Sequence, residues 1–365
     1  VLGGIAFPWL ALAQQAGDEE PVRARALGVV TVNGGPPSSL PTQIPTTIEG
    51  VTREEIDARI NATDSEDALK YLPSLLVRKR YIGDYNHAIL STRASGTGNS
   101  ARSAVYADGI LLSNYLGNGI ANGTNYAPRW GLVTPEEIER VDVMYGPFSA
   151  AYPGNSAGAV VDYVTRMPTK LEAHVSAGYS SQPNDLYGAC RTYNSWQTSA
   201  SLGSSSGGWS WWVNVNRTDS QGQPQTFATA LAASGTPGAA GTPVAGAVPG
   251  LNTTNQPWYI LGSGTQYRTV QDHAKLKLAY DITPTLRASY TLGWWQNSAQ
   301  GNSTSFLTGP DGQPVASGLV NIAGRGYTVA PSAFPTTSDA QTHAMHGVSL
   351  KSHTQGEFDW ELAAS

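Results

Sequence analysis

From Glu172 onward the sequence alternates apolar with polar residues at a period of two, in seven separate segments. These segments cover residues 172–179, 196–203, 209–217, 273–281, 285–294, 346–351 and 357–364. A period of two places successive side chains on opposite faces of a β-strand. In the third segment, for example, Trp211 and Val213 face away from Ser210 and Asn214. The pattern therefore predicts seven antiparallel strands, each with one apolar and one polar face.

The connections between these strands alternate in length. Short turns are predicted at residues 204–208, near 283–284 and at 354–356, and the other connections are long and rich in Gly, Pro, Ala, Ser and Thr. Short turns at one end and long loops at the other are typical of an outer-membrane β-barrel, whose outward face is apolar and whose lumen is polar. No segment has the ~18 uninterrupted apolar residues that indicate a transmembrane helix. A soluble all-β domain with similar alternation is the alternative.

Charged residues are concentrated in the first part of the chain. Asp, Glu, Lys and Arg make up 13% of the sequence, about half of the ~25% usual for a soluble domain. They become sparse after Pro168, where tryptophan becomes frequent, so we place a domain boundary at this proline. The net charge is −5 and the one basic cluster is Arg78 to Arg80. A nucleic-acid partner is therefore not expected.

Before this boundary the sequence predicts a small α+β domain over residues 42–168. A capping box, Thr52 with Glu55, opens a helix at Arg53. The other expected elements are strands at 45–51, 103–110, 141–145 and 159–165, a helix at 64–72 ended by Pro73, a turn at Asp108-Gly109 and a helical turn at 135–140.

Four stretches of this domain, in this order, resemble the plug of TonB-dependent outer-membrane receptors. They are TTIE with TREEI between residues 46 and 56, DALKYLP at 67–73, VYADGI at 105–110, and EIERVDV with Gly146-Pro147 after residue 136. In that family the plug fills the lumen of a barrel with 22 strands. The resemblance implies an α+β N-terminal plug domain (42–168), followed at 169–365 by antiparallel strands of an incomplete transmembrane β-barrel with long extracellular loops. Because the chain stops inside an alternating run, we expect a truncated fragment of a longer receptor.

The N-terminal residues have the features of an exported protein. Residues 1–13 are apolar and end in Ala11-Leu12-Ala13, which indicates the remnant of a signal peptide. Residues 14–41 then form a periplasmic segment with a linker and a stretch that resembles the TonB box. The box consists of Leu27, Gly28, Val29, Val30, Thr31 and Val32. In the family it pairs as an added strand with the energy-coupling protein TonB; the alternative is an edge strand of the plug.

The resemblance also implies where cargo and plug contacts lie. Aromatic and amide groups at the plug apices suit an organic chelate or a sugar. The candidates are Tyr81, Tyr85, His87, Tyr115, Asn118, Asn122, Tyr126 and Arg129, with the loop around Trp258 and Tyr259; each has the alternative of an ordinary loop or interface residue. Three plug arginines, Arg93, Arg102 and Arg140, are candidates for ion pairs with carboxylates of the barrel wall, or alternatively for ion pairs inside the plug.

Little in the sequence indicates catalysis. His343 and His346 are three apart in an expected strand and face opposite sides, which disfavours a shared metal ion. There is one cysteine, and no phosphate-binding loop and no nucleophile elbow. No enzyme, cofactor or resident metal is expected.

We therefore expect a TonB-dependent importer of a ferric siderophore or similar metal chelate in the outer membrane of a Gram-negative bacterium. Its plug and N-terminus would lie on the periplasmic side, and its partners would be TonB, outer-membrane lipid and an extracellular metal-chelate ligand. Vitamin B12, haem, a copper complex or an oligosaccharide are alternative cargoes. A surface binding or adhesion barrel without transport and a soluble secreted lectin are alternatives of other classes.

Overall fold

The structure is a computed structural model. It describes residues 39–41, 44, 46–93, 99–100, 103–114, 118–121, 124–125, 127–146, 152–154, 156–354 and 358–365. These residues belong to a single compact unit, 38–365. The plug region and the strands that follow it are therefore packed against one another.

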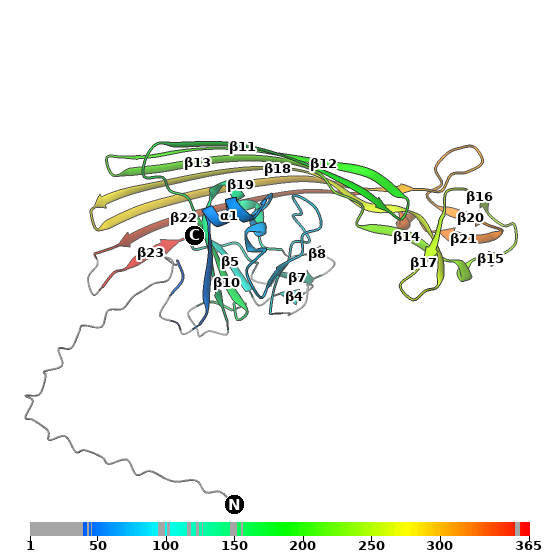
Figure 1. The fold of residues 1–365 in the computed structure, drawn as a ribbon, viewed down its shortest axis with the longest axis horizontal. Coiled ribbons are helices and arrows are strands. Elements are labelled where there is room, and N and C mark those ends of the chain that lie inside the picture. The colour runs from blue at the N-terminus through cyan, green and yellow to red at the C-terminus, as the bar shows by residue number, and fades with distance from the viewer. Residues whose placement is uncertain are drawn as a thin grey trace, which may run out of the picture. The chain divides into compact units, whose positions relative to one another are not determined.

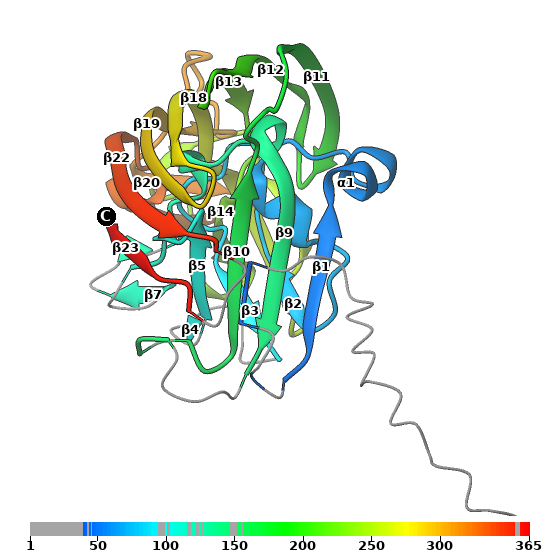
Figure 2. The same ribbon diagram turned by 90° about the vertical axis from the view of Figure 1, so that its left-hand side faces the viewer.

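A five-stranded sheet organises the first part of the chain (Figures 1 and 2). Its order is β1 (Ile48–Thr52), β9 (Ile138–Tyr145), β10 (Ala159–Thr165), β5 (Ser103–Ala107) and β6 (Ile110–Leu111). β10 pairs antiparallel with β9 and parallel with β5. Asp108 and Gly109 have positive φ angles of 49° and 78° and form the turn between β5 and β6 that the sequence predicts. The predicted strand at 159–165 is confirmed in full, and the strand expected at 141–145 begins earlier, at Ile138.

Short helices and paired strands cover this sheet. Helix α1 (Arg53–Arg59) begins with the predicted capping box, in which the Glu55 backbone N–H donates to Thr52. The remaining short elements are η1 (Ser65–Leu69), β2 (Leu75–Val77), β3 (Leu90–Thr92), β4 (Asn99–Ser100), β7 (Asn118–Ala121), β8 (Thr124–Asn125), η2 (Trp130–Leu132) and η3 (Pro135–Glu137). Among the helices that the structure describes, none has the length and apolar character needed to cross a membrane.

The second predicted helix, 64–72, differs from expectation because η1 is a 3₁₀-helix of five residues. Pro73 explains the difference. It lacks the N–H that would bond to the Leu69 carbonyl in an α-helix, and the Leu72 N–H donates to that carbonyl over 3.1 Å instead. The expected apolar contact survives, because Ala68 and Leu69 are buried in the core.

The second sheet has nine strands, of which seven antiparallel strands follow one another in chain order. They are β11 (Glu172–Leu186), β12 (Ala189–Ser206), β13 (Trp209–Gln221), β18 (Pro257–Thr283), β19 (Leu286–Ser305), β22 (Thr337–Ser352) and β23 (Glu361–Ala364). The first six predicted strands are thus confirmed and extend beyond the alternating segments, and the seventh, predicted over 357–364, is a strand over 361–364. Within the described residues β11 and β23 are edge strands, so the sheet does not close on itself.

The two faces of this sheet have the polarity that the alternation predicts. Val175, Trp209 and Val213 are on the outward face with exposed fractions of 78%, 55% and 38%. Ser210 and Asn214 are on the inner face, which the plug covers, and both are buried. A soluble protein buries its apolar face, so this arrangement is the reverse of that in a soluble β-domain.

The two long connections fold together at the end of the sheet opposite the three predicted short turns (Figure 1), and the two-residue turn between β11 and β12 also lies at this end. Their elements are β14 (Thr226–Leu231), η4 (Ala232–Ser234), β15 (Thr236–Pro237), β16 (Thr242–Pro243), β17 (Val248–Leu251), β20 (Gly318–Ile322), β21 (Arg325–Val329) and η5 (Pro331–Ala333). A four-stranded sheet, β15-β21-β20-β16, joins the two connections. Buried side chains such as Leu307, Val320 and Tyr327 give it a core of its own. We call residues 226–262 and 306–334 the loop lobe.

Candidate functional site

The plug is held against the inner face of the large sheet by buried ion pairs. Lys275 on β18 donates to Glu137 Oε1 over 2.8 Å, and both side chains are fully buried. Glu137 closes the capping box of η3, since its carboxylate also accepts the Thr134 backbone N–H over 2.8 Å. The Thr134 hydroxyl in turn accepts from Asn214 Nδ2 of β13 over 2.7 Å. Helix η3 thus holds the Glu137 carboxylate at a fixed position against the large sheet, which we call the wall.

A second acid of the same helix, Glu136, lies close to two arginines and one histidine. Its carboxylate lies 3.6 Å from Arg53, 3.9 Å from Arg166 and 2.8 Å from Nδ1 of His174 on β11. Arg166 also donates to Glu172 at the start of the first wall strand over 2.8 Å. These contacts hold the chain where it passes from the plug to the sheet.

The third plug–wall ion pair lies at the β5–β6 turn. Lys277 Nζ is 3.0 Å from Asp108 Oδ2 and donates to Thr165 Oγ1 over 2.8 Å. Burial opposes ionisation of Asp108, but the positive charges of Lys277 and Lys275 and two hydrogen bonds from Thr165 outweigh it and lower the pKa of this carboxyl. Asp108 is therefore ionised and paired at neutral pH.

In the two lysine pairs the wall supplies the cation and the plug supplies the acid, whereas Arg166 of the plug pairs with the wall acid Glu172. The arginines predicted from the sequence for plug–wall pairs were Arg93, Arg102 and Arg140. Arg140 lies 2.9 Å from Asp142 and pairs inside the plug, the alternative that the sequence left open. Arg93 is exposed in a turn with a φ of 48°, and Arg102 lies outside the described residues. Lys275 and Lys277 could not be predicted as plug partners, because an inward lysine in an alternating strand also suits a water-filled lumen.

The predicted plug-apex residues Tyr81, Tyr85 and His87 come together against one wall residue, Tyr267 of β18. The Tyr81 ring stacks on Tyr267 with centroids 5.6 Å apart, and the Tyr85 ring meets it edge-on at 6.2 Å. The Tyr85 hydroxyl donates to Asp339 of β22 over 2.8 Å. Burial raises the pKa of the Tyr85 hydroxyl, as does its bond to that carboxylate. This cluster joins the plug to the wall at its long-loop end.

The other predicted ligand residues are placed only in part. Arg129 precedes η2 and lines the cavity described below. Only the backbone of Asn118, in β7, is described. The TonB-box residues Leu27, Gly28, Val29, Val30, Thr31 and Val32, and the candidates Tyr115, Asn122 and Tyr126, lie outside the described residues.

Glycines allow the plug and the wall to approach closely at two points. A Cβ on Gly131 of the plug would lie 2.2 Å from the indole nitrogen of Trp295 on β19. A Cβ on Gly347 of β22 would lie 2.6 Å from Cδ1 of Ile110 on the plug. Real Cβ contacts are longer than this, so larger residues at these positions require the packing to shift.

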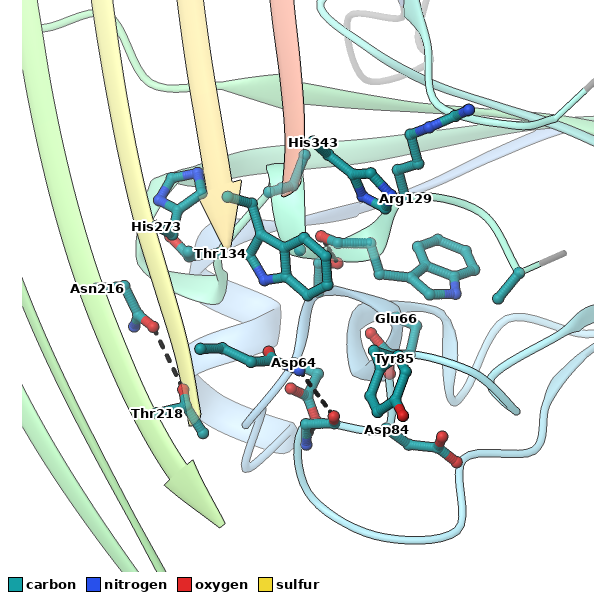
Figure 3. A pocket seen from close by; sticks show the side chains of 18 of the residues that line it. Asp64, Glu66, Asp84, Tyr85, Arg129, Thr134, Asn216, Thr218, His273 and His343 are labelled. Atoms are coloured by element: carbon teal, nitrogen blue, oxygen red, sulfur yellow. Dashed lines mark hydrogen bonds between the residues drawn. The ribbon is translucent and has the colours of Figure 1, made fainter. Parts of the chain in front are cut away.

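A cavity of about 230 Å³ remains between the plug and the inner face (Figure 3). Asn216, Thr218 and His273 lie on the wall side, and Asp64, Glu66 and Asp84 lie on the plug side. It is smaller than the ~300–1,000 Å³ of typical ligand pockets. It therefore suits a small polar group and not a whole bulky ligand.

Burial and hydrogen bonds act on the three acids that line the plug side of the cavity. Burial raises the pKa of Glu66 well above its ordinary value, and Glu66 Oε2 has no hydrogen-bond partner among the described residues. Asp64 accepts from Lys79 Nζ over 2.9 Å. Asp84 accepts from the backbone N–H of Arg80 and of His87, each over 2.9 Å. Burial thus favours the uncharged form of Glu66, whereas Asp64 and Asp84 accept hydrogen bonds from their neighbours.

Within the described ranges no group of three His, Cys, Asp or Glu side chains could hold a metal ion. Cys190 is exposed, with its thiol 2.7 Å from the Asp185 carboxylate at the end of β11. The site is therefore a polar interface between a plug and a wall, with a small cavity inside it.

An apolar outward face, a polar inner face and a plug domain ion-paired to that face define the class of plugged outer-membrane receptors. Comparison with known families agrees. Residues 41–160 match the family model described as the TonB-dependent Receptor Plug Domain. Residues 41–160 thus form a plug domain of the TonB-dependent receptor family, and the strands that follow form an open antiparallel sheet.

Several solved structures are similar to this chain. A variant of the ferric enterobactin receptor PfeA of Pseudomonas aeruginosa is 14% identical, with 88% of this chain and 48% of that chain covered and a TM-score of 0.49. The siderophore receptor PirA of Pseudomonas aeruginosa is 14% identical, with 87% and 48% covered and a TM-score of 0.44. BauA, the ferric preacinetobactin receptor of Acinetobacter baumannii, is 14% identical, with 84% and 44% covered and a TM-score of 0.44. The chain thus spans about half the length of these receptors. No curated protein matches it.

Proposed function

We propose that this receptor is an energy-coupled importer of the outer membrane and that its cargo is a ferric siderophore or a similar metal chelate. The observation that carries the proposal is the reversed polarity of the large sheet combined with the plug on its inner face. An exposed apolar band suits lipid. A plug in the lumen makes passive flow of a large solute impossible, so transport needs a device that displaces the plug.

The TonB-box-like residues 27–32 are the proposed coupling device. They precede the plug by a short linker that joins the chain at Ser39, where the described structure begins. The Ser39 backbone N–H and hydroxyl donate to Asp142 Oδ2 over 2.7 and 2.8 Å. A pull on the N-terminal segment would therefore act first on Asp142 in β9, a central strand of the plug sheet.

In the proposed orientation the long-loop end faces the exterior, and the plug with the N-terminal segment faces the periplasm. The Tyr81, Tyr85 and Tyr267 cluster and the loop lobe would then be the first parts that cargo meets. The two long connections at one end of the sheet support this orientation, because long loops lie at the extracellular end of outer-membrane barrels.

The test is uptake by a strain in which this receptor is the sole route for iron chelates. Val30→Pro removes a backbone donor from the proposed added strand, whereas Val30→Ala keeps it. We expect Val30→Pro to abolish uptake of iron-55 chelates while surface binding persists, and Val30→Ala to retain uptake. Uptake that survives in Val30→Pro would rule out this box. Binding without uptake in every strain, the wild type included, would instead favour a surface binding barrel.

A further inference from the structure

The loop lobe and the strands that lead to it carry almost no charge. Residues 220–267 contain no Asp, Glu, Lys, Arg or His. Between Arg287 and Asp339 only Asp311 and Arg325 are charged. In the first half of the chain charged residues are frequent, so this part of the surface is distinct in its chemistry.

The two charges of the lobe are engaged within it. Asp311 Oδ1 accepts the Gln313 backbone N–H over 3.1 Å and stabilises a turn. Arg325 Nη2 donates to the Gly235 carbonyl over 2.5 Å and joins the two connections. Exposed side chains of the lobe include Leu251 and Leu319, with exposed fractions of 60% and 47%. The lobe thus offers apolar groups, hydroxyls and amides to a ligand, and no cluster of cations.

The inner wall below the lobe continues this pattern. One cross-strand row places uncharged side chains opposite one another on five neighbouring strands: Gln197, Thr218, Gln271, Asn297 and Gln341. All but Asn297 line the cavity. Asn297 is fully buried, and neither of its amide atoms has a hydrogen-bond partner among the described residues. The wall therefore presents neutral donors and acceptors at the level of the plug.

The described residues place no cluster of cations at the cavity. Asp64 and Asp84 on the plug and one arginine, Arg129, line it, and Asp64 already accepts from Lys79. The wall lysines nearest to the cavity are already bonded to plug acids. A strongly negative ligand would find no positive electrostatic potential at this part of the wall. It would lose its hydration without forming ion pairs.

We infer that the cargo is a neutral ferric chelate of the trihydroxamate kind and not a polyanionic one; this inference rests on the proposed function. Three hydroxamates each lose one proton and together cancel the charge of Fe(III). Three catecholates each lose two protons and leave a complex with three negative charges. The trihydroxamate complex presents carbonyl and N–O oxygens and an alkyl surface. These groups fit the amides and hydroxyls of the wall and the exposed leucines of the loop lobe.

The first test compares uptake of iron-55 as a trihydroxamate and as a tricatecholate in cells with this receptor as the sole route. We expect energy-dependent uptake of the trihydroxamate at least about tenfold faster than of the tricatecholate. Preferred uptake of the tricatecholate would overturn the inference while the proposed importer stands. Failure to take up either chelate would remove the iron-chelate proposal itself.

The second test changes charge at one position of the wall. Gln341→Glu and Gln341→Lys both remove the amide of a half-buried residue that lines the cavity, and they introduce charges of opposite sign. For a neutral cargo we expect the two variants to change the trihydroxamate transport rate by the same factor, to within about threefold. A rate that rises with Lys and falls with Glu would show an anionic cargo and would overturn the inference.

The salt dependence of binding gives a third, independent measure on outer membranes that contain the receptor. Raising NaCl from about 50 to about 500 mM shortens the Debye length severalfold. The dissociation constant of the trihydroxamate should change by less than about twofold. A weakening of tenfold or more would indicate attraction between charges and would contradict a neutral cargo.

Discussion

Lys275 on β18 and Glu137 on η3 form a fully buried ion pair that joins the wall to the plug, with Nζ 2.8 Å from Oε1. His273 Nε2 lies 3.6 Å from the same carboxylate oxygen. Neither charged group has access to water, so each depends on the other for its charge to be tolerated. A pull that separates plug from wall at this point must expose or neutralise both groups.

Removing one partner of this pair should loosen the plug strongly. Lys275→Met or Glu137→Gln alone leaves an unpaired buried charge, at a cost of about 3–5 kcal/mol. The double variant should recover most of this loss, because a buried pair replaced by neutral groups is often nearly neutral. Hydrogen exchange of the η3 and β9 peptides in the detergent-solubilised receptor measures the effect.

The exposed pair Arg217–Asp272 on the outward face is the matched control. Its atoms are also 2.8 Å apart, but the side chains are 51% and 38% exposed. Arg217→Met should therefore cost less than about 1 kcal/mol. Equal losses at the exposed and the buried pair would show that Lys275 and Glu137 do not depend on each other.

Gly131 of the plug packs so closely on the Trp295 indole of the wall that a larger side chain should not fit. Gly131→Ala places a methyl group where the indole lies and should cost about 1–3 kcal/mol or more. Gly154→Ala is the control, since a Cβ there has no atom within 4 Å. The added substitution Trp295→Leu should restore part of the stability of Gly131→Ala, as measured by urea-induced release of the plug. Without such rescue, the steric explanation fails.

Asp162 on β10 makes the plug sensitive to pH. It pairs in register with Asp142 of β9 and is buried. Burial raises the pKa of the Asp162 carboxyl to about 6, and the charges of Asp108 and Asp142 act in the same direction, against hydrogen bonds from Ser39 and Gly109. The folded plug therefore binds this proton more tightly than the unfolded chain, whose carboxyl has the ordinary pKa of 3.8.

The sign of the pH effect follows from that difference. The stability that protonated Asp162 provides is fully present below about pH 4 and is lost as the pH rises through about 6. Asp162→Asn should thus stabilise the plug by on the order of 3 kcal/mol at pH 7.5 and by nothing near pH 4. Hydrogen exchange of β9 and β10 at both pH values measures this. Asp57→Asn, at a side chain 63% exposed, should follow the wild-type profile, and a constant benefit of Asp162→Asn at all pH values would refute the assignment.

Much of the fold could be predicted because its strongest signals are local. The capping box at Thr52, the Asp108-Gly109 turn and the alternation of β13 depend on neighbouring residues only. The long-loop ends of the strands could not be predicted. Above the apolar band both faces of β18 are polar, as at Arg268 and Gln271, so the period of two disappears from the sequence although the strand continues.

The loop lobe and the plug–wall contacts were missed for a different reason. Strands such as β15 and β16 are two residues long and end in proline, and they exist because the two connections share a core. The Lys275–Glu137 pair joins residues far apart in the chain. Such contacts follow from the register of the folded sheet, and a single sequence carries no sign of them.

The outward face provides the last prediction, on membrane insertion. Val213 is 38% exposed and lies opposite Leu202 and Leu276 of the neighbouring strands, between the Trp209–Tyr280 ring pair and the Arg217–Asp272 ion pair. In a lipid-facing band of this kind an arginine near the midplane costs about 2–4 kcal/mol. Val213→Arg should therefore reduce the fraction of receptor that folds into lipid vesicles, measured by heat-modifiable mobility in gels, whereas Val213→Leu should fold as the wild type does. If Val213→Arg folds as well as Val213→Leu, this face is not in contact with lipid, and the membrane assignment of the sheet must be abandoned even though the plug contacts remain.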